Sequence, residues 1–113
     1  MKLFTCVPDS SQCGDSTCPV ELLLNMIGGK WKGVILFHLL DKTLRFNEIK
    51  RLLPNITQRM LTNQLRELEA DGLVARQVFA QVPPKVEYSL TAKGQSLAPI
   101  IRSMEQWGRD NLL

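Results

Sequence analysis

The chain has 113 residues, which is enough for one domain and short for two. Its 44% hydrophobic and 22% charged residues are typical of a folded protein and not of a disordered one. No apolar run approaches the roughly 20 residues of a membrane-spanning helix, and the N-terminus lacks the basic and apolar regions of a secretory signal. We therefore expect one folded domain in the cytoplasm.

The net charge of +3 is unevenly distributed along the chain. Residues 30–93 hold 11 of the 14 Lys and Arg residues and six acidic residues, a net charge of +5. The first 29 residues carry a net charge of −2, and the last 20 are neutral. A polyanion would therefore meet the middle of the chain, although many solvated surfaces are equally basic.

The first half of the chain predicts an arm followed by two helices. Residues 1–17 are polar and turn-rich, and we expect a flexible N-terminal arm before a domain over residues 18–113. A first helix should begin at Cys18-Pro19, where proline costs no hydrogen bond, and end at Gly28-Gly29. A second helix is expected over residues 30–41, with the only histidine, His38, in a structural role. The residues expected in its core face are Trp31, Val34, Ile35, Phe37 and Leu39.

Two further helices follow, separated by a tight turn. The first should span residues 48–53, with Asn47 as its cap and Pro54-Asn55 as its break. The second lies within Ile56–Val74, with Thr57 as N-cap and Gly72 as C-terminal stop. Leu61, Leu65 and Leu68 fall on one side of it, and Arg59, Asn63 and Arg66 on the other. This layout is a helix-turn-helix whose second helix suits base edges in the major groove; an ordinary amphipathic surface helix would show the same stripe.

The last third of the chain predicts a β-hairpin and a helix. Residues 73–79 and 86–90 are rich in strand formers, and the Pro83-Pro84 pair between them fits a hairpin tip. A hairpin directly after a helix-turn-helix is a wing. Lys85 is expected at its tip, where its ammonium group either contacts a DNA phosphate or is simply solvated. A last helix is expected over residues 95–111. Its apolar stripe consists of Leu97, Ile100, Ile101, Met104 and Trp107, and predicts a dimer interface together with the first helix, or else intramolecular packing.

Six short motifs occur in a fixed order from Cys18 to about Trp107. They are Cys18-Pro19-Val20-Glu21, Gly28-Gly29-Lys30-Trp31, Arg45-Phe46-x-Glu48-Ile49, Leu53-Pro54-x-Ile56-Thr57, the leucine run from Met60 to Leu73, and the run from Val82 to Thr91. In this order they resemble the HxlR-type winged-helix transcriptional regulators of bacteria and archaea. The resemblance implies a mainly α fold with a small β hairpin, a winged helix-turn-helix that binds operator DNA as a homodimer through its first and last helices.

The predicted DNA contacts follow from the second helix of this unit and the wing. Arg59 and Asn63 are expected to contact bases, because Arg reads guanine and Asn reads adenine through paired hydrogen bonds. Thr57 and Gln58, at the positive end of the helix, suit a phosphate. The remaining expected contacts are Thr62, Arg66 and Lys85, with Arg45 open between phosphate binding and internal pairing. Two copies should read a near-palindrome with half-sites about 34 to 36 Å apart.

The cysteines raise a second hypothesis. Cys18 lies at a predicted helix start, where the helix dipole favours the thiolate, the form that reacts with oxidants and electrophiles. The resemblance also implies a sensor role, since the matching cysteine has one in some members. Cys6 and Cys13 depart from the single-cysteine pattern and are either partners of Cys18 or incidental. Cys18 can equally be a small buried hydrophobic residue.

The sequence fits three other functions less well. Three cysteines and one histidine add up to a set for structural zinc or for a metal-responsive regulator, which is an alternative function. The spacing lacks the short Cys-x₂₋₄-Cys pair, so no metal is expected. The sequence lacks a Gly-rich phosphate loop and a nucleophile beside a histidine, so neither an enzyme nor a cofactor is expected. A winged helix that binds proteins should show apolar groups at Arg59, Asn63 and Arg66.

Overall fold

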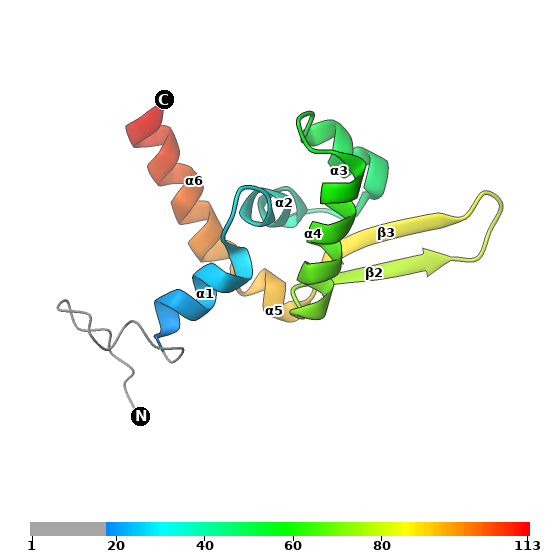
Figure 1. The fold of residues 1–113 in the computed structure, drawn as a ribbon, viewed down its shortest axis with the longest axis horizontal. Helices are drawn as coiled ribbons and strands as arrows, with labels where there is room; N and C mark the ends of the chain where they lie inside the picture. The colour runs from blue at the N-terminus through cyan, green and yellow to red at the C-terminus, as the bar shows by residue number, and fades with distance from the viewer. Residues whose placement is uncertain (1–17) are drawn as a thin grey trace.

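The computed structural model describes residues 18–113, so the predicted arm, with Cys6 and Cys13, lies outside the described residues. The helices are α1 (Pro19–Ile27), α2 (Lys32–Leu39), α3 (Phe46–Leu52), α4 (Gln58–Ala70), α5 (Ala92–Gln95) and α6 (Ala98–Leu112). The strands are β1 (Leu44–Arg45), β2 (Val74–Phe79) and β3 (Lys85–Leu90). Figure 1 shows α1 and α6 at one end of the molecule and the β2–β3 hairpin projecting from the other. None of the helices between residues 18 and 113 is long and apolar enough to cross a membrane.

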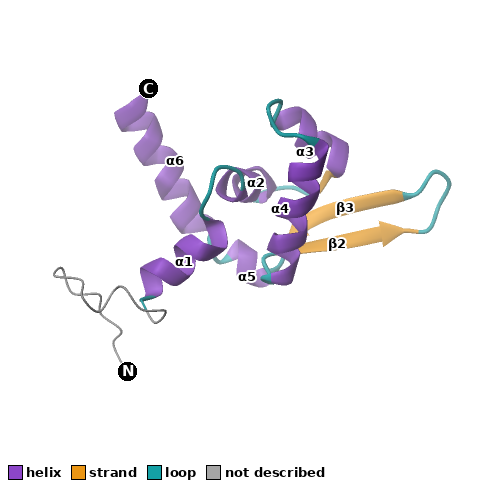
Figure 2. Cartoon of the chain, in the orientation of Figure 1, coloured by secondary structure: helices purple, strands orange, loops and turns teal. Residues whose placement is uncertain are grey.

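The predicted hairpin is present, and it belongs to a three-stranded antiparallel sheet of order β1-β3-β2 (Figure 2). β2 pairs with β3 along its whole length, from Val74 opposite Leu90 to Phe79 opposite Lys85. β1 pairs Leu44 with Tyr88 and was not predicted. Two residues are too few to show alternation, so only the pairing with β3 defines this strand.

The core is built from the apolar faces of α2, α3 and α4 and one side of the sheet. Leu61, Leu65 and Leu68 of α4 are fully buried, as their helical spacing predicted. Tyr88, at 8% exposure, is the one aromatic residue in the buried core of residues 18–113. The buried cluster consists of Ile27, Ile35, Leu36, Leu39, Leu40, Leu44, Ile49, Leu53, Ile56, Leu61, Leu65, Leu68, Leu73, Val74, Tyr88 and Ile101.

The start of α3 differs from the prediction. The helix begins at Phe46, two residues early, and its N-cap is Arg45, not Asn47. The reason is a local hydrogen bond, because the Glu48 carboxylate accepts from the backbone N–H of Arg45 at 2.7 Å. This contact satisfies the backbone N–H of Arg45, so the helix can begin at the next residue. β1 therefore leads directly into α3.

The predicted C-terminal helix is present as α6, but it begins at Ala98 and not at Gln95, and a short helix that was not predicted, α5, precedes it. The short helix α5 begins after Thr91, whose hydroxyl accepts from the N–H of Gly94 at 3.0 Å. Leu97 then precedes α6, in which Pro99 occupies the first turn. A proline there gives up no intrahelical hydrogen bond and starts a new helix, whereas inside a continuous helix it would remove one.

Helix α2 is shorter than predicted, and Val34 is not a core residue. Ile35, Leu36 and Leu39 are buried, whereas Val34 is 39% exposed. Val34 lies instead on the side toward α1 and α6, where it lines an apolar hollow of about 550 Å³ together with Leu24 and Met104. The amphipathic pattern identified apolar residues correctly but could not separate the core from this second apolar face.

Candidate nucleic-acid interface

Helix α4 has the predicted caps at both ends. The Thr57 hydroxyl accepts from the backbone N–H of Met60 at 3.0 Å, which makes Thr57 the N-cap. Gly72 has a φ of 77°, a left-handed conformation that side chains disfavour, and the chain leaves the helix there. These caps set the ends of α4, and its buried Leu61, Leu65 and Leu68 fix which side chains face outward.

The outward side chains of α4 form one shallow hollow, which we call the reading face. It has a volume of about 580 Å³, and its lining residues are Gln58, Arg59, Thr62, Asn63 and Arg66. Five predicted DNA contacts are therefore brought together. Within residues 18–113, neither Arg59 nor Arg66 forms an ion pair, so both guanidinium groups keep all their donors for a ligand.

The acidic residues of α4 are paired away from this face. Glu67 forms an ion pair with Lys32 of α2 at 2.5 Å, and Glu69 lies 3.7 Å from the guanidinium of Arg76 on β2. Their negative charge is thus partly neutralised by the protein's own bases. The reading face itself has two cationic side chains and no acid, which favours a polyanion.

Thr62 is the member of the reading face whose hydroxyl proton is already used. It donates to the backbone carbonyl of Gln58 at 2.9 Å, one helical turn earlier. The hydroxyl oxygen can still accept a hydrogen bond. Thr62 is therefore suited to a base amino group and not to a phosphate, which has only acceptors.

Arg45 and Lys85 lie apart from the reading face, in a second hollow between α3 and the hairpin. This hollow has a volume of about 350 Å³, and Arg51 adds a third cationic side chain to it. Lys85 is the first residue of β3, with its ammonium 3.2 Å from Glu87 and 4.9 Å from the centre of the Phe79 ring. The Arg45 guanidinium forms no ion pair with any described residue, so the internal pairing considered for it is not seen.

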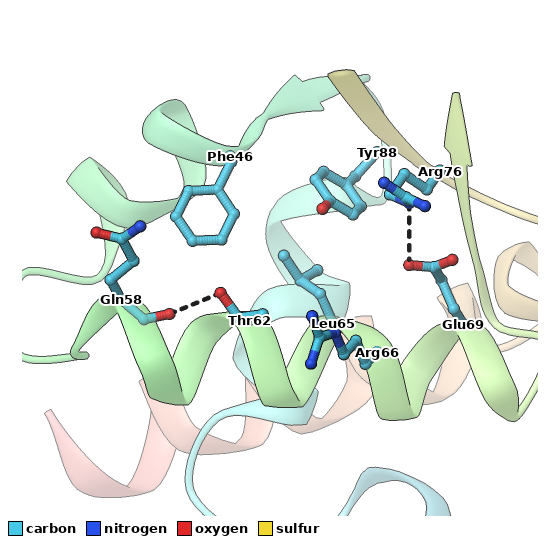
Figure 3. Close-up of a pocket in the computed structure, with 8 residues that line it drawn as sticks. All are labelled: Phe46, Gln58, Thr62, Leu65, Arg66, Glu69, Arg76 and Tyr88. Carbon is cyan, nitrogen blue, oxygen red and sulfur yellow. Dashed lines mark hydrogen bonds and ion pairs between the residues drawn. The ribbon is translucent and has the colours of Figure 1, made fainter. Parts of the chain in front are cut away.

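A third hollow, about 390 Å³ in volume, lies between α4 and the sheet and contains residues that the sequence did not single out as contacts (Figure 3). We call it the Tyr88 pocket. Its lining residues are Phe46, Gln58, Thr62, Leu65, Arg66, Glu69, Arg76 and Tyr88. Arg76 and Tyr88 are directly opposite in the β2–β3 register and so share one face of the sheet. Only that register brings them together, which is why sequence patterns missed them.

Burial raises the pKa of the Tyr88 hydroxyl, and nearby charges act on it as well. The positive charges of Arg76 and Arg66 oppose the rise in pKa, and the negative charge of Glu69 adds to it. The hydroxyl is therefore protonated at neutral pH and can donate a hydrogen bond.

The proposed sensor residue lies at the opposite end of the molecule. Cys18 is the N-cap of α1, is 5% exposed and is disulfide-bonded, while Cys6 and Cys13 lie outside the described residues. His38 stands edge-on to the ring of Phe37 at 5.4 Å. Across residues 18–113, no three His, Cys, Asp or Glu side chains form a group that could hold a metal ion.

Comparison with known proteins agrees with this geometry. Residues 26–113 match the family model described as HxlR-like helix-turn-helix. The chain is 62% identical over 94 residues to YybR of Bacillus subtilis, an uncharacterised HTH-type transcriptional regulator, a match that covers 83% of this chain and 75% of YybR.

Solved structures show the same likeness. The oxidised form of the redox regulator HypR superposes with a TM-score of 0.81 at 62% identity, over 83% of this chain and 97% of that one. The reduced form of the transcriptional regulator YodB from B. subtilis gives a TM-score of 0.73 at 38% identity, over 85% and 95% of the two chains. The chain therefore belongs to the HxlR-like helix-turn-helix family of transcriptional regulators.

Proposed function

We propose that the chain binds operator DNA with α4 in the major groove, where Arg59 and Asn63 contact base edges. The observation that carries this proposal is the reading face, an exposed surface with two guanidinium groups unpaired among the described residues. Arg and Asn side chains match guanine and adenine edges, respectively. The same surface has no exposed apolar side chain, which argues against a protein-binding winged helix.

Backbone contacts would flank the base contacts. Thr57 and Gln58 lie at the N-terminal end of α4, where the helix dipole favours a phosphate. The Thr57 oxygen accepts from Met60, which leaves its hydroxyl proton available. Arg45 and Lys85 would meet a second phosphate region beside the wing, Lys85 after giving up its contact with Glu87. These contacts position the protein without reading sequence.

A second copy of the chain would cover the apolar end of the molecule. Exposed apolar side chains gather on α1, α2 and α6 around the hollow lined by Leu24, Val34 and Met104. They are Val20, Leu22, Leu24, Val34, Ile100, Met104 and Trp107. Leu24, Val34 and Met104 share one hollow, and exposed apolar surface of this kind marks an interaction site. A twofold pair formed here would place two α4 helices on successive major grooves and require a near-palindromic operator.

Regulation by oxidation is the second part of the proposal, and it takes support from the likeness to HypR, a redox regulator. Cys18 begins α1, one of the two helices proposed to hold the dimer. Because Cys18 is disulfide-bonded in this structure, the α1 described above is that of the oxidised form. That bond forms when two thiols lose two electrons and two protons to an oxidant such as a peroxide, and its reduction would change how the start of α1 is held. Cys6 and Cys13 are the candidate partners within the chain. The proposal assigns no catalytic role to the chain, and a cytoplasmic location follows from contact with DNA.

Footprinting of the purified protein on the DNA upstream of its own gene tests the DNA-binding part. Arg59→Ala should weaken binding by about 1 to 3 kcal/mol and relax the preference at one position in each half-site. Lys85→Ala should weaken binding similarly on all sequences. Unchanged affinity and preference in the Arg59 variant would overturn the base-reading assignment, and a protein partner in place of DNA would become the better hypothesis.

Mild oxidation of the same preparation tests the regulatory part. Operator affinity should change after treatment with peroxide and return after treatment with a thiol reductant, whereas Cys18→Ser should respond to neither. If the wild-type protein keeps its affinity while mass spectrometry finds Cys18 reduced, the sensor role is excluded.

A further inference from the structure

The Tyr88 pocket is continuous with the reading face. Gln58, Thr62 and Arg66 line both hollows, so the pocket opens toward the surface that we propose faces DNA. Its opposite wall is the sheet, through Arg76 of β2 and Tyr88 of β3 (Figure 3). The pocket therefore lies in the corner where a DNA backbone would pass between α4 and the wing.

Tyr88 presents a hydroxyl that the protein does not satisfy. The residue is 8% exposed, yet within residues 18–113 its hydroxyl has no hydrogen-bond partner. No described side chain has a fully buried oxygen or nitrogen without a partner, so the Tyr88 oxygen must still be reached by solvent. Figure 3 shows the hydroxyl pointing into the pocket toward α4. A phosphate oxygen in the pocket would take the place of solvent at this hydroxyl and accept its hydrogen bond.

Two guanidinium groups complete the set of donors. Arg66 forms no ion pair with any described residue, and the Nε of Arg76 lies 3.7 Å from the nearest Glu69 oxygen, beyond hydrogen-bond length. Two cationic and one acidic side chain give the pocket a net charge of +1. Glu69 lies on one side of the Arg76 guanidinium, and most of the Arg76 N–H groups remain available to a ligand.

We propose that the Tyr88 pocket binds one phosphate of the DNA backbone, with hydrogen bonds from the Tyr88 hydroxyl and the guanidinium groups of Arg66 and Arg76. A phosphodiester offers only acceptors, and the unused groups of these three residues are donors. The inference rests on the proposed function and sharpens it in two ways. It assigns Arg66 to a backbone contact, and it connects the wing strands to the same DNA strand that α4 approaches.

Binding of the full chain to its operator and to unrelated DNA tests this proposal. Tyr88→Phe, which keeps the ring, and Arg76→Gln should each weaken binding about tenfold on both DNAs, the effect of one hydrogen bond to a charged group. Arg76→Gln should also reduce the slope of log affinity against log salt by about one. Arg109→Gln on α6 removes the same charge far from the pocket and should leave the slope unchanged. Circular dichroism and urea unfolding establish that each variant is folded.

Replacement of single phosphates by neutral methylphosphonates locates the contact. In each half-site, one such replacement should lower the DNA affinity of the wild-type protein about tenfold. The same replacement should lower the affinity of Tyr88→Phe and Arg76→Gln only slightly, because these variants have already lost the contact. Wild-type affinity in both variants, or the absence of such a position, would overturn the proposal. Inorganic phosphate provides the other arm: if it binds at Tyr88 while both variants keep full DNA affinity, the pocket is a small-anion site and the proposal is wrong. If Arg59→Ala also leaves DNA affinity unchanged, both the pocket proposal and the proposed DNA-binding function are wrong. If Arg59→Ala lowers the affinity and the two pocket variants do not, only the pocket proposal is wrong.

Discussion

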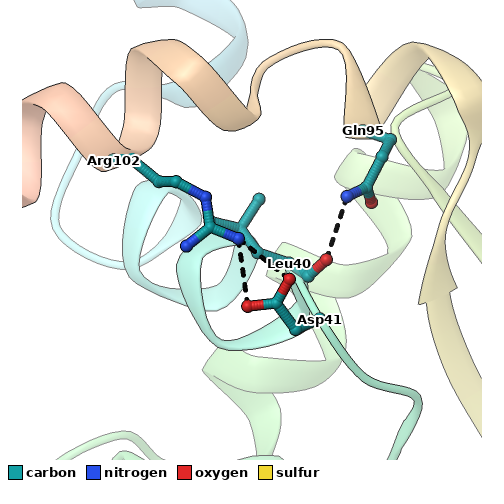
Figure 4. Close-up of polar contacts among 4 residues, drawn as sticks. All are labelled: Leu40, Asp41, Gln95 and Arg102. Carbon is teal, nitrogen blue, oxygen red and sulfur yellow. Dashed lines mark hydrogen bonds and ion pairs between the residues drawn. The ribbon is translucent and has the colours of Figure 1, made fainter.

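Arg102 of α6 and Asp41, two residues after α2, form an ion pair in which one guanidinium nitrogen lies 2.8 and 3.0 Å from the two carboxylate oxygens (Figure 4). Beside it, the Gln95 side chain donates to the carbonyl oxygen of Leu40 at 3.0 Å. Both contacts join the end of α2 to the C-terminal helices. They help to set the angle at which α6 leaves the body of the molecule, and hence the spacing of the two reading faces in the proposed dimer.

The Arg102–Asp41 pair should contribute little to stability because both side chains are largely exposed. We expect Arg102→Ala to lower the free energy of unfolding by less than about 1 kcal/mol, and a double-mutant cycle with Asp41→Ala to give a coupling of the same size. High salt should remove the coupling. Urea unfolding measures it, and a coupling well above this range would mean that the pair is buried in the assembled protein.

Trp107 should be central to self-association. It is 61% exposed on α6, and we expect Trp107→Glu to convert the proposed dimer to a monomer, since a charge buried in an apolar interface is costly. Val78 on the wing has a comparable exposure of 56%, and Val78→Glu should leave the assembly unchanged. Sedimentation equilibrium measures both variants. A dimer that survives Trp107→Glu would contradict the proposed interface.

Gly94 lies against the backbone of Leu73. A Cβ added there would overlap the carbonyl oxygen of Leu73, so Gly94→Ala should destabilise the fold by about 1 to 3 kcal/mol or more. Gly33 in α2 is the matched control, because its added Cβ would meet Ile27 only at ordinary van der Waals distance. Thermal unfolding should show a lower midpoint for the first variant and an unchanged or slightly higher one for the second.

His38 predicts a pH dependence of stability. Burial, with a smaller effect of Lys42, lowers its pKa from the ordinary value of 6.5. The unfolded chain therefore binds a proton more readily than the folded one, and stability should fall as the pH is lowered through about 6.5 and below. Unfolding measured between about pH 7.5 and 5.5 should show this decline, and His38→Gln should reduce it. An equal decline in both proteins would assign it to other groups.

Local chemistry in the sequence determined α4 and its orientation. Thr57 and Gly72 mark the ends of the helix, and the spacing of Leu61, Leu65 and Leu68 identifies its buried side, so Arg59 and Asn63 had to face outward. The hairpin was likewise predicted from its strand-forming residues and from the Pro83-Pro84 pair between them. These features depend on neighbours within one or two turns, and such information is contained in the order of residues.

The tertiary structure decided what depends on contacts between distant segments. β1 exists only because Leu44 pairs with Tyr88, and α5 is separated from α6 by a turn at residues 96–97. The helical pattern predicted Val34 in the core, but in the structure it is partly exposed and lines the apolar hollow beside α1 and α6. The Tyr88 pocket unites α4 with two strands whose register brings Arg76 opposite Tyr88. A strand register is set by pairing across the sheet, so side chains far apart in sequence become one site only when the chain has folded.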